Sequence, residues 1–371
     1  MNKITITRQN GNIPKSLPGE DHVSGLVFRT PPPTGGTITA DTIYPCSSLD
    51  EAERLGLKSS QSSAWQHLAD LFRVNPGVEL YICFSTDEDY QCIGRMQNYA
   101  GGRIRQVGIL DMQTNTASDG VLATNVALLQ GVADALAQEQ APLSILYGVF
   151  AREGMPTNVA SVGNSRVSVV IGGAMGAAGK PEPAIGVVLG LVSRAAVHQS
   201  IGWVKQFPTG VATPYIGMLG AVRDIDKATL ASLDAARYIF LTTYPGIGGS
   251  YVNDSHTMDV DTSDYAMIES VRTMDKAVRG IYTYLTPELG GNVYVDADTG
   301  RLQPYSVSHL ENCANRALED MAKAGELSGY KAEIDPEQDV LSTSTIEVVV
   351  KNVPVGVARR INVKIGFTKT V

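Results

Sequence analysis

The sequence predicts a larger α/β domain with a mixed sheet, followed by a smaller C-terminal α+β domain. Three observations lead to this fold class. Up to about residue 260, amphipathic helices alternate with near-continuous apolar strands, which is typical of a sheet covered on both faces. Beyond that point, long helices and short strands follow one another without this alternation. Both ends of the chain carry a short ribbon in which apolar and polar residues alternate, as they do along a strand with one apolar face.

Composition restricts the class of protein. The 371 residues suit two or three domains at roughly 150 residues each. Hydrophobic residues make up 43% and charged residues 18%, which indicates a folded chain. The net charge of −8 argues against binding to nucleic acid, because contacts to phosphates need lysine and arginine. Four scattered cysteines indicate neither a disulfide framework nor a CxxC zinc site.

The sequence also predicts where the protein is made. The first ten residues lack the apolar core of a secretion signal. The longest apolar run, residues 185–197, is interrupted by Arg194 and is shorter than the roughly 20 residues that a bilayer span needs. We therefore expect a cytoplasmic protein that does not insert directly into a membrane.

The first domain begins after an extended arm. Ile4 and Ile6 alternate with threonines, and a stretch rich in Gly, Pro and Asn then leads to the first core strand, "SGLVF". Ser48 and Glu51 form a capping box that opens the first helix. Further strands are expected at "VELYICF", "QVGILDM", "LSILYGVF", "RVSVVIGG" and "YIFLTTY", with helices between them. This pattern assigns residues 1–24 to an N-terminal arm and residues 25–260 to the α/β domain.

Residues 261–356 form the predicted α+β domain. Ser263 is the expected N-cap of a long helix that ends at Thr286-Pro287. Its apolar stripe consists of Ile268, Val271, Met274, Val278, Ile281 and Leu285. A hairpin with its turn at residues 298–300 follows. A capping box of Ser308 and Glu311 opens a second helix that ends near Gly325 or Gly329, and a strand at "TIEVVV" comes next.

Motifs of catalysis or ligand binding are weak. The loop at residues 172–179 is rich in glycine, but Ala174 and Pro181 occupy positions where a Walker A loop needs Gly and Ser or Thr. The acidic stretch "NDSHTMDVDTSD" lacks the spacing of an EF-hand and is explained by a solvated loop that precedes a helix. No catalytic signature appears, so we expect no enzyme, no cofactor and no metal. An α/β enzyme with a ligand site at residues 172–179 stays an alternative.

The closing ribbon, residues 357–371, is the most informative feature of the sequence. Ile361, Val363, Ile365 and Phe367 fall on one face of the expected strand. Native proteins usually shield such an edge. The ribbon could fold back as a hairpin on the preceding strand of its own subunit. It could instead add a strand to a sheet of a neighbouring copy, a head-to-tail contact that generates rings or helical polymers.

Four stretches resemble the contractile tail sheath proteins of phages and related injection machines, in particular a compact branch from Bacteroidetes-type prophage elements. "LPGEDHVSGLVF" resembles the junction of arm and core. "KPEPAIGVVLGLVSRAAVHQSIGWVKQFP" resembles the sheath segment in which a proline-led helix precedes a Gly-Trp element. Residues 272–335 resemble the C-terminal helix, hairpin and helix, although "YLTPELGGNVYVD" departs from the aromatic, Asn-rich segment of many sheaths. "IEVVVKNVPVGVARRINVKI" resembles the last two strands and the C-terminal arm.

The resemblance implies an architectural subunit. Sheath subunits stack as sixfold rings in a helical array around a tail tube, and their arms add strands to the C-terminal domains of neighbours. Ile4 and Ile6 would pair with one neighbour, and Ile361, Val363, Ile365 and Phe367 with another. The partners implied are further copies, a tail tube protein, and baseplate and tail terminator proteins. Contraction would drive the tube through an envelope without nucleotide hydrolysis. Assembly would occur in the cytoplasm of the bacterial host, before the subunit becomes part of a virion tail or injection apparatus.

Two further alternatives stay open. Another self-assembling structural protein, such as a tube or capsid component, would share the predicted polymerisation. From Lys351 onward the chain carries cations and no acid, and Lys351, Arg359, Arg360 and Lys364 are candidate contacts to an acidic tube. Cations on an edge strand can also serve only to block aggregation.

Overall fold

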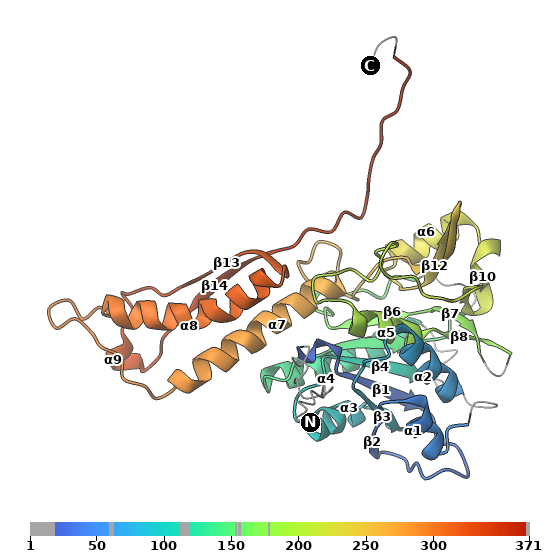
Figure 1. The fold of residues 1–371 in the computed structure, drawn as a ribbon, viewed down its shortest axis with the longest axis horizontal. Helices are drawn as coiled ribbons and strands as arrows, with labels where there is room; N and C mark the ends of the chain where they lie inside the picture. The colour runs from blue at the N-terminus through green and yellow to red at the C-terminus, as the bar shows by residue number, and fades with distance from the viewer. Residues whose placement is uncertain are drawn as a thin grey trace, which may run out of the picture.

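A six-stranded mixed sheet forms the centre of the larger unit (Figure 1). The computed structural model describes residues 19–58, 63–111, 119–152, 154, 157–176 and 179–368. The strand order is β2-β3-β1-β4-β5-β6, and β2 alone runs antiparallel to its neighbour. The strands are β1 (Ser24–Arg29), β2 (Ile43–Pro45), β3 (Leu80–Phe84), β4 (Gln106–Asp111), β5 (Ser144–Gly148) and β6 (Val167–Val170). This arrangement confirms the predicted mixed α/β fold.

Helices cover both faces of this sheet. Every residue of β1, β3, β4, β5 and β6 is buried, which explains why these strands read as continuous apolar runs. Leu26 and Phe28 of β1 pack on the side that holds α1 (Leu49–Arg54), α2 (Ser63–Val74) and α5 (Ile185–Arg194). Val27 packs on the opposite side, against α3 (Cys92–Tyr99) and α4 (Asp119–Gln138). The predicted cap is confirmed, since the Ser48 hydroxyl accepts from the Glu51 N–H at 3.3 Å.

One helix in the described part of the chain is long and apolar enough to cross a membrane by length and composition alone. This helix, Gly120–Gln138 within α4, has a mean hydropathy of 1.4. Its Val126, Leu129 and Ala133 are fully buried in the hydrophobic core beside the sheet. These contacts are those of a core helix.

A second layer of short strands extends the larger unit. Residues 166–173, predicted as one strand, divide at Ile171 between two sheets. The second sheet has the order β10 (Gly220–Ala221), β9 (Tyr215–Ile216), β7 (Gly172–Met175) and β8 (Pro181–Pro183). The predicted strand divides here because the segment around Ile239 lies against it. Ile239 pairs with Val170, and the Ile239 carbonyl accepts from the Ile171 N–H at 2.9 Å. The remaining elements are η1 (Glu20–His22), η2 (Gly217–Leu219), η3 (Val222–Asp224), α6 (Lys227–Ala235), β11 (Leu241–Tyr244) and β12 (Ile247–Val252).

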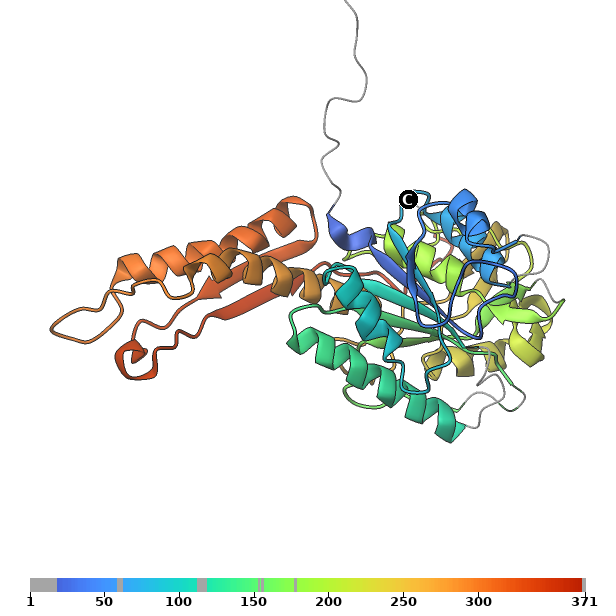
Figure 2. The ribbon, with the colours of Figure 1, turned by 90° about the horizontal axis from the view of Figure 1, so that it is seen from below.

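The C-terminal unit is elongated, consists mainly of two helices and a hairpin, and projects from the larger unit (Figures 1 and 2). Its elements are α7 (Ile268–Leu285), η4 (Thr286–Glu288), α8 (Pro304–Lys323), β13 (Leu327–Glu333), α9 (Val340–Thr343) and β14 (Val349–Pro354). β13 and β14 pair antiparallel and form a two-stranded sheet. The hydrophobic cluster between helices and hairpin includes the buried side chains of Ala277, Leu318, Met321 and Leu327.

Several expectations for this unit were wrong in detail. α7 begins at Ile268, and the Ser263 hydroxyl instead donates to Asp259 at 2.7 Å. α8 begins at Pro304, because proline fits the first turn of a helix, so Ser308 lies inside the helix. The predicted hairpin around residues 298–300 reduces to a turn with a single bridge between Val295 and Leu302. β13 was not predicted.

Candidate functional site: the terminal arms and their roots

From Ile361 to Phe367, the closing ribbon is not paired as a strand with its own subunit. Residues 361–368 belong to no strand, and Ile361 and Ile365 expose 80% and 96% of their surface. Val363 and Phe367 are equally open. Figure 1 shows this segment running away from both units. The alternative of an intramolecular hairpin is therefore wrong for the described residues, because β14 pairs with β13 and not with the ribbon. Ile4 and Ile6 of the other arm lie outside the described residues.

Ion pairs hold the C-terminal root, defined here as Val355–Arg360. The Arg359 Nε lies 3.0 Å from Asp254 Oδ2, and its Nη2 contacts Glu269 at the start of α7. Burial alone would lower the pKa of Arg359, but Glu269 and Asp254 outweigh this effect and raise it. A cavity of about 730 Å³, lined in part by Trp203 and Tyr244, lies beside the root. The root is therefore fixed more by charge than by packing.

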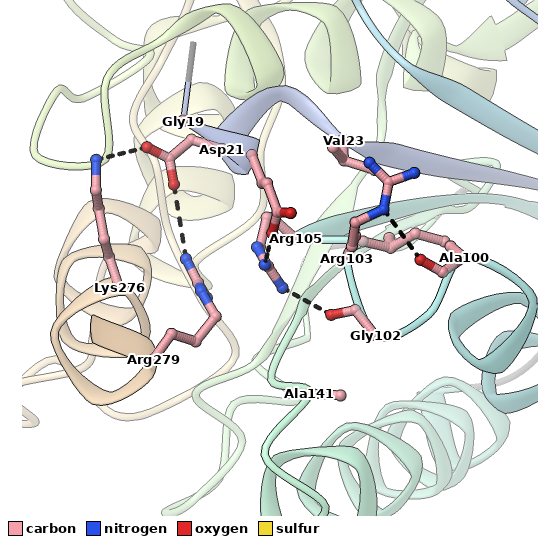
Figure 3. Close-up of polar contacts among 12 residues, drawn as sticks. Gly19, Asp21, Val23, Ala100, Gly102, Arg103, Arg105, Ala141, Lys276 and Arg279 are labelled. Carbon is pink, nitrogen blue, oxygen red and sulfur yellow. Dashed lines mark hydrogen bonds and ion pairs between the residues drawn. The ribbon is translucent and has the colours of Figure 1, made fainter. Parts of the chain in front are cut away.

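A second set of ion pairs holds the N-terminal root, Gly19–Val23 (Figure 3). Asp21 lies 2.6 Å from Lys276 Nζ and 3.6 Å from Arg279 Nη2, both on α7. Burial would raise the pKa of Asp21, but the cations, Lys276 foremost, lower it below its usual range. Glu20 forms an ion pair with Arg105, whose Nη1 also donates to the carbonyl of Gly102 at 2.8 Å. The N-terminal root is thus anchored on α7 and on Arg105, just before β4.

α7 connects the two roots. The residues that contact them are Glu269, Arg272, Lys276 and Arg279, spaced by three, four and three positions along one face of the helix. Arg272 is buried, and its guanidinium donates to the carbonyls of Ala195 and Asp21. Lys276 also pairs with Glu326, just before β13. One helix face therefore contacts both arm roots and the C-terminal hairpin.

The opposite side of α7 is only half covered. Ile268 and Val271 are buried as the predicted stripe requires. Further along, the stripe borders an open groove of about 490 Å³ between α7 and β14, whose α7 side includes Met274, Val278, Ile281 and Leu285 and whose β14 side is Val350 and Asn352. Asn352 Oδ1 is buried and has no hydrogen-bond donor among the described residues. The outer edge of β14 pairs with no described strand. We call this surface the α7–β14 groove.

The four cations predicted to face a tube differ in their surroundings. Lys351 Nζ lies 2.8 Å from Glu333 across the hairpin. Arg359 is engaged with Asp254 and Glu269, as described above. Arg360 and Lys364 form no ion pair with described residues and are exposed. Contact with a tube stays a prediction, and these two cations are the most available for it.

The glycine-rich stretch at residues 172–179 forms the β7–β8 hairpin in its described part, rather than a loop that leads into a helix. A Cβ on Gly173 would lie 1.6 Å from the Glu182 carbonyl, and one on Gly172 would lie 2.4 Å from Phe240 Cα. These two glycines permit close approach of neighbouring backbone segments. The neighbouring acidic loop serves the fold as well, since Asp254 binds Arg359 and Asp259 accepts from the Gly163 N–H at 3.0 Å.

Sequence patterns alone did not identify the arm roots. Asp21, Asp254 and Glu269 lie far from their partners in sequence, so no local motif joins them. One signal was available: the charged positions from Glu269 to Arg279 recur at helical spacing opposite the apolar stripe.

Family models match almost the whole chain. Residues 1–256 match the DUF2586 N-terminal domain, and residues 264–371 match the DUF2586 C-terminal domain. A protein of Haemophilus phage HP1 (strain HP1c1), described as a tail sheath protein, is 28% identical over 164 residues. That match spans 42% of this chain and 41% of the length of the relative.

Solved structures share the fold at low sequence identity. A chain of the anti-feeding prophage baseplate aligns with a TM-score of 0.65 and 15% identity over 99% of both chains. A chain of the contracted sheath complex of the extracellular contractile injection system PVC gives 0.64 and 14%, again over 99% of both. The sheath tail protein of Desulfitobacterium hafniense gives 0.55 and 9%, over 95% of this chain and all of the other. The chain belongs to the DUF2586 family and has the fold of contractile tail sheath proteins.

Proposed function

We propose that this protein is the structural subunit of a contractile tail sheath, with an architectural rather than an enzymatic role. It would polymerise as a sixfold helical array around a tail tube and contract to drive the tube through a target envelope. The relatives and structural neighbours described above support this proposal. The subunit would assemble in the cytoplasm of a bacterial host and then form part of a virion tail or injection apparatus.

One observation carries the proposal: an exposed apolar ribbon and an uncovered apolar groove occur in the same chain. The ribbon alternates Ile361, Val363, Ile365 and Phe367 with polar residues and pairs with no described strand of its own subunit. A two-stranded hairpin is marginal in water, and added strands stabilise it. We infer that the ribbon of one copy pairs with the C-terminal hairpin of the next.

The α7–β14 groove is the best candidate to receive the ribbon. A strand added beside β14 would satisfy the free N–H and C=O groups of its outer edge. The apolar face of that strand would cover Val278 and Ile281 of α7 and Val350 of β14. A donor on the incoming chain would also satisfy the buried Oδ1 of Asn352. The N-terminal arm, with Ile4 and Ile6, would add a strand to a different neighbour.

Residues 25–260 and 261–356 would then act as separate domains, with arms at 1–24 and 357–371. The arms join subunits while the roots on α7 fix where each arm leaves its own copy. Such a lattice can rearrange during contraction without losing connectivity, because strand pairing between subunits persists when the domains move. Arg360 and Lys364 would supply a salt-sensitive contact to an acidic tube.

The first test compares the full chain with arm variants by negative-stain electron microscopy. We expect hollow tubes from the full chain and folded single subunits after deletion of residues 361–371, which keeps the root. The matched pair is Val363→Asp with Ile365→Asp on the apolar face and Asn362→Asp with Thr368→Asp on the polar face. Only the first pair should abolish tubes, because it places charges against the groove. Polymers that persist in the deletion variant would contradict the role of the arm.

Complementation tests the groove. A groove-blocked variant, Val278→Glu with Ile281→Glu, should fold but fail to polymerise. Mixed with the arm-deleted chain it should yield discrete heterodimers, because one variant retains the donor and the other retains the acceptor. Analytical ultracentrifugation distinguishes this outcome from unmixed subunits. A mixture that contains no heterodimer would contradict the assignment of the groove.

A further inference from the structure

At the far end of the C-terminal unit, three metal-ligating side chains from two segments converge. Glu288 belongs to η4, and His309 and Cys313 lie one turn apart on α8. Their ligand atoms all lie within 4.8 Å of one another. His309 Nε2 is 2.9 Å from Glu288 Oε2, and Cys313 Sγ is 4.0 Å from Glu288 Oε1. Among the described residues this is the one such group of three or more.

We propose that Glu288, His309 and Cys313 form a binding site for a single Zn²⁺ ion. Zinc binds thiolate sulfur at about 2.3 Å and imidazole nitrogen and carboxylate oxygen at about 2.0–2.2 Å, in a tetrahedral arrangement. Ligand atoms around such an ion lie about 3.3–3.8 Å apart. The two separations from Glu288, 2.9 Å to His309 and 4.0 Å to Cys313, lie on either side of this range, and all three ligand atoms lie within 4.8 Å of one another, so side-chain shifts of about an ångström would complete the site.

The donor set selects the metal. One sulfur, one nitrogen and one oxygen ligand suit zinc, whereas magnesium and calcium prefer oxygen ligands throughout. The His309 and Cys313 side chains lie at i and i+4 on one helix, so the same face presents both donors without any loop having to close around the ion. The helical spacing also explains why a search for CxxC or HExxH motifs does not find the site.

The fourth coordination position has room. Glu288 and His309 also line a cavity of about 510 Å³, together with residues 289–294 and the side chains of Tyr305 and Leu310. Three protein ligands leave one position for water or for a group from another molecule, as in other zinc sites with an open position. The Tyr305 ring stacks on the imidazole of His309 at 6.4 Å between centroids. This stacking restricts the orientation of one ligand.

A bound ion would join the end of α7 to the middle of α8. The segment between them, residues 289–303, contains a turn and a single bridge but no regular strand. A metal ion bound by Glu288, His309 and Cys313 would link the two ends of this segment. We therefore expect zinc to stabilise the distal end of the C-terminal unit, independently of assembly.

Metal titration of the tag-free full chain tests the site. After removal of metal with a chelator, Zn²⁺ binding is measured by competition with a chromophoric chelator, and Co²⁺ serves as a spectroscopic probe. We expect one ion per chain and a thiolate-to-cobalt charge-transfer band in the near ultraviolet. Cys313 is the one cysteine of the four that is not buried, so this band reports on it specifically.

Three variants decide the outcome. Cys313→Ser should remove the cobalt band, and both Cys313→Ser and His309→Ala should weaken zinc binding at least tenfold. His22→Ala, at a partly exposed histidine outside the cluster, is the matched control and should bind as the wild type does. Circular dichroism confirms that each variant is folded. The proposal is overturned if the wild type takes up no stoichiometric zinc, or if Cys313→Ser and His309→Ala bind zinc as tightly as His22→Ala.

Discussion

The six-stranded sheet and the C-terminal hairpin use their side chains in opposite ways. In the sheet, all residues of the five parallel strands are buried between two layers of helices. In the hairpin, β14 buries none of its residues fully, and only Leu327 and Ala332 of β13 are buried. The larger unit thus completes its core within one chain, whereas the C-terminal unit leaves apolar surface uncovered. In the proposed sheath, the C-terminal unit would therefore be the one that other copies complete.

The two units also differ in how charge is placed. Around the large sheet, the buried charges Arg29 and Asp111 pair with each other at 2.7 Å within the core. At the junction with the C-terminal unit, charges on α7 instead pair with the segments from which the two arms extend. The larger unit therefore holds a charge pair inside its core, whereas the charges on α7 hold the segments from which the two arms extend.

The largest expected effect is in the sheet core. Leu189→Ala on α5 removes a fully buried side chain and should lower the free energy of unfolding of the isolated subunit by about 2–5 kcal/mol. Val350→Ala in the half-open hairpin should cost the isolated subunit far less but should markedly weaken the polymer. Urea denaturation of disassembled subunits measures the first quantity, and the critical concentration for assembly measures the second. If the two variants lost equal free energy of unfolding and weakened assembly equally, the proposed difference between the two units would be wrong.

The N-terminal root should give an intermediate effect. Asp21→Asn removes the partner of Lys276 and Arg279 and should lower the free energy of unfolding at pH 7 by about 1–3 kcal/mol. The folded-state pKa of Asp21 lies below its unfolded value of about 3.9. The stabilisation is therefore fully present above about pH 4 and disappears as the pH falls through the lower, folded-state pKa.

Urea titrations of wild type and Asp21→Asn between pH 7 and pH 2.5 measure this difference. Asp298→Asn, at an exposed turn carboxylate, is the control and should leave stability unchanged. A stability gap between wild type and Asp21→Asn that stays constant down to the lowest pH would show that Asp21 does not act through its charge.

Weakening the C-terminal root should loosen the hold on the arm more than it lowers the free energy of unfolding of the subunit. Glu269→Gln weakens the ion pair of Arg359, so trypsin should cleave after Arg359 several-fold faster. Cleavage after Lys364, which has no described ion pair, provides an internal reference in the same digest. Raising the salt concentration should accelerate cleavage after Arg359 in the wild type relative to cleavage after Lys364. A cleavage ratio that is insensitive to both changes would mean that the root is held by packing.

The smallest effect is expected on the surface of the hairpin. Lys351→Met breaks an exposed cross-strand pair with Glu333, and such pairs contribute little to stability. The thermal midpoint of the subunit should not change measurably. The pKa of Glu333, which hydrogen bonds to Lys331 and Lys351 lower to about 2, should rise partway toward its usual value, because Lys331 remains. Carboxyl-detected NMR titration follows this change. An unaltered pKa of Glu333 in Lys351→Met would show that Lys351 does not lower it.

Elements with strong local signals were predictable from sequence. The apolar runs from "SGLVF" to "RVSVVIGG" led to the parallel strands, and Ser48 with Glu51 correctly marked the start of α1. β13 was missed because "LSGYKAE" carries a glycine and three polar or charged residues, and its strand conformation depends on pairing with β14. Ser263 and Ser308 were plausible caps, but Ser263 instead donates to Asp259 four residues earlier, and the proline at residue 304 opens α8 before Ser308.

The arms were partly predictable as well. The period-two pattern from Ile361 to Phe367 identified the ribbon, and its exposure agrees with that pattern. The pattern could not reveal the roots, because Arg359 and Asp254 are separated by 105 positions and Lys276 and Asp21 by 255. Contacts of this kind follow from the packing of the first half of α7 against the larger unit. Strand exchange itself involves a second molecule, so neither the sequence nor a single subunit displays it.

The anchored position of Arg359 sets a length scale for any lattice. An extended chain advances at most about 3.5 Å per residue, so the nine residues from Arg360 to Thr368 can reach about 30 Å from their fixed point. In the proposed sheath, a neighbouring copy that binds these residues would therefore have to hold its acceptor within that distance of Arg359, both before and after contraction. The same reach would limit how far adjacent copies could rotate or slide past one another without breaking the proposed strand pairing.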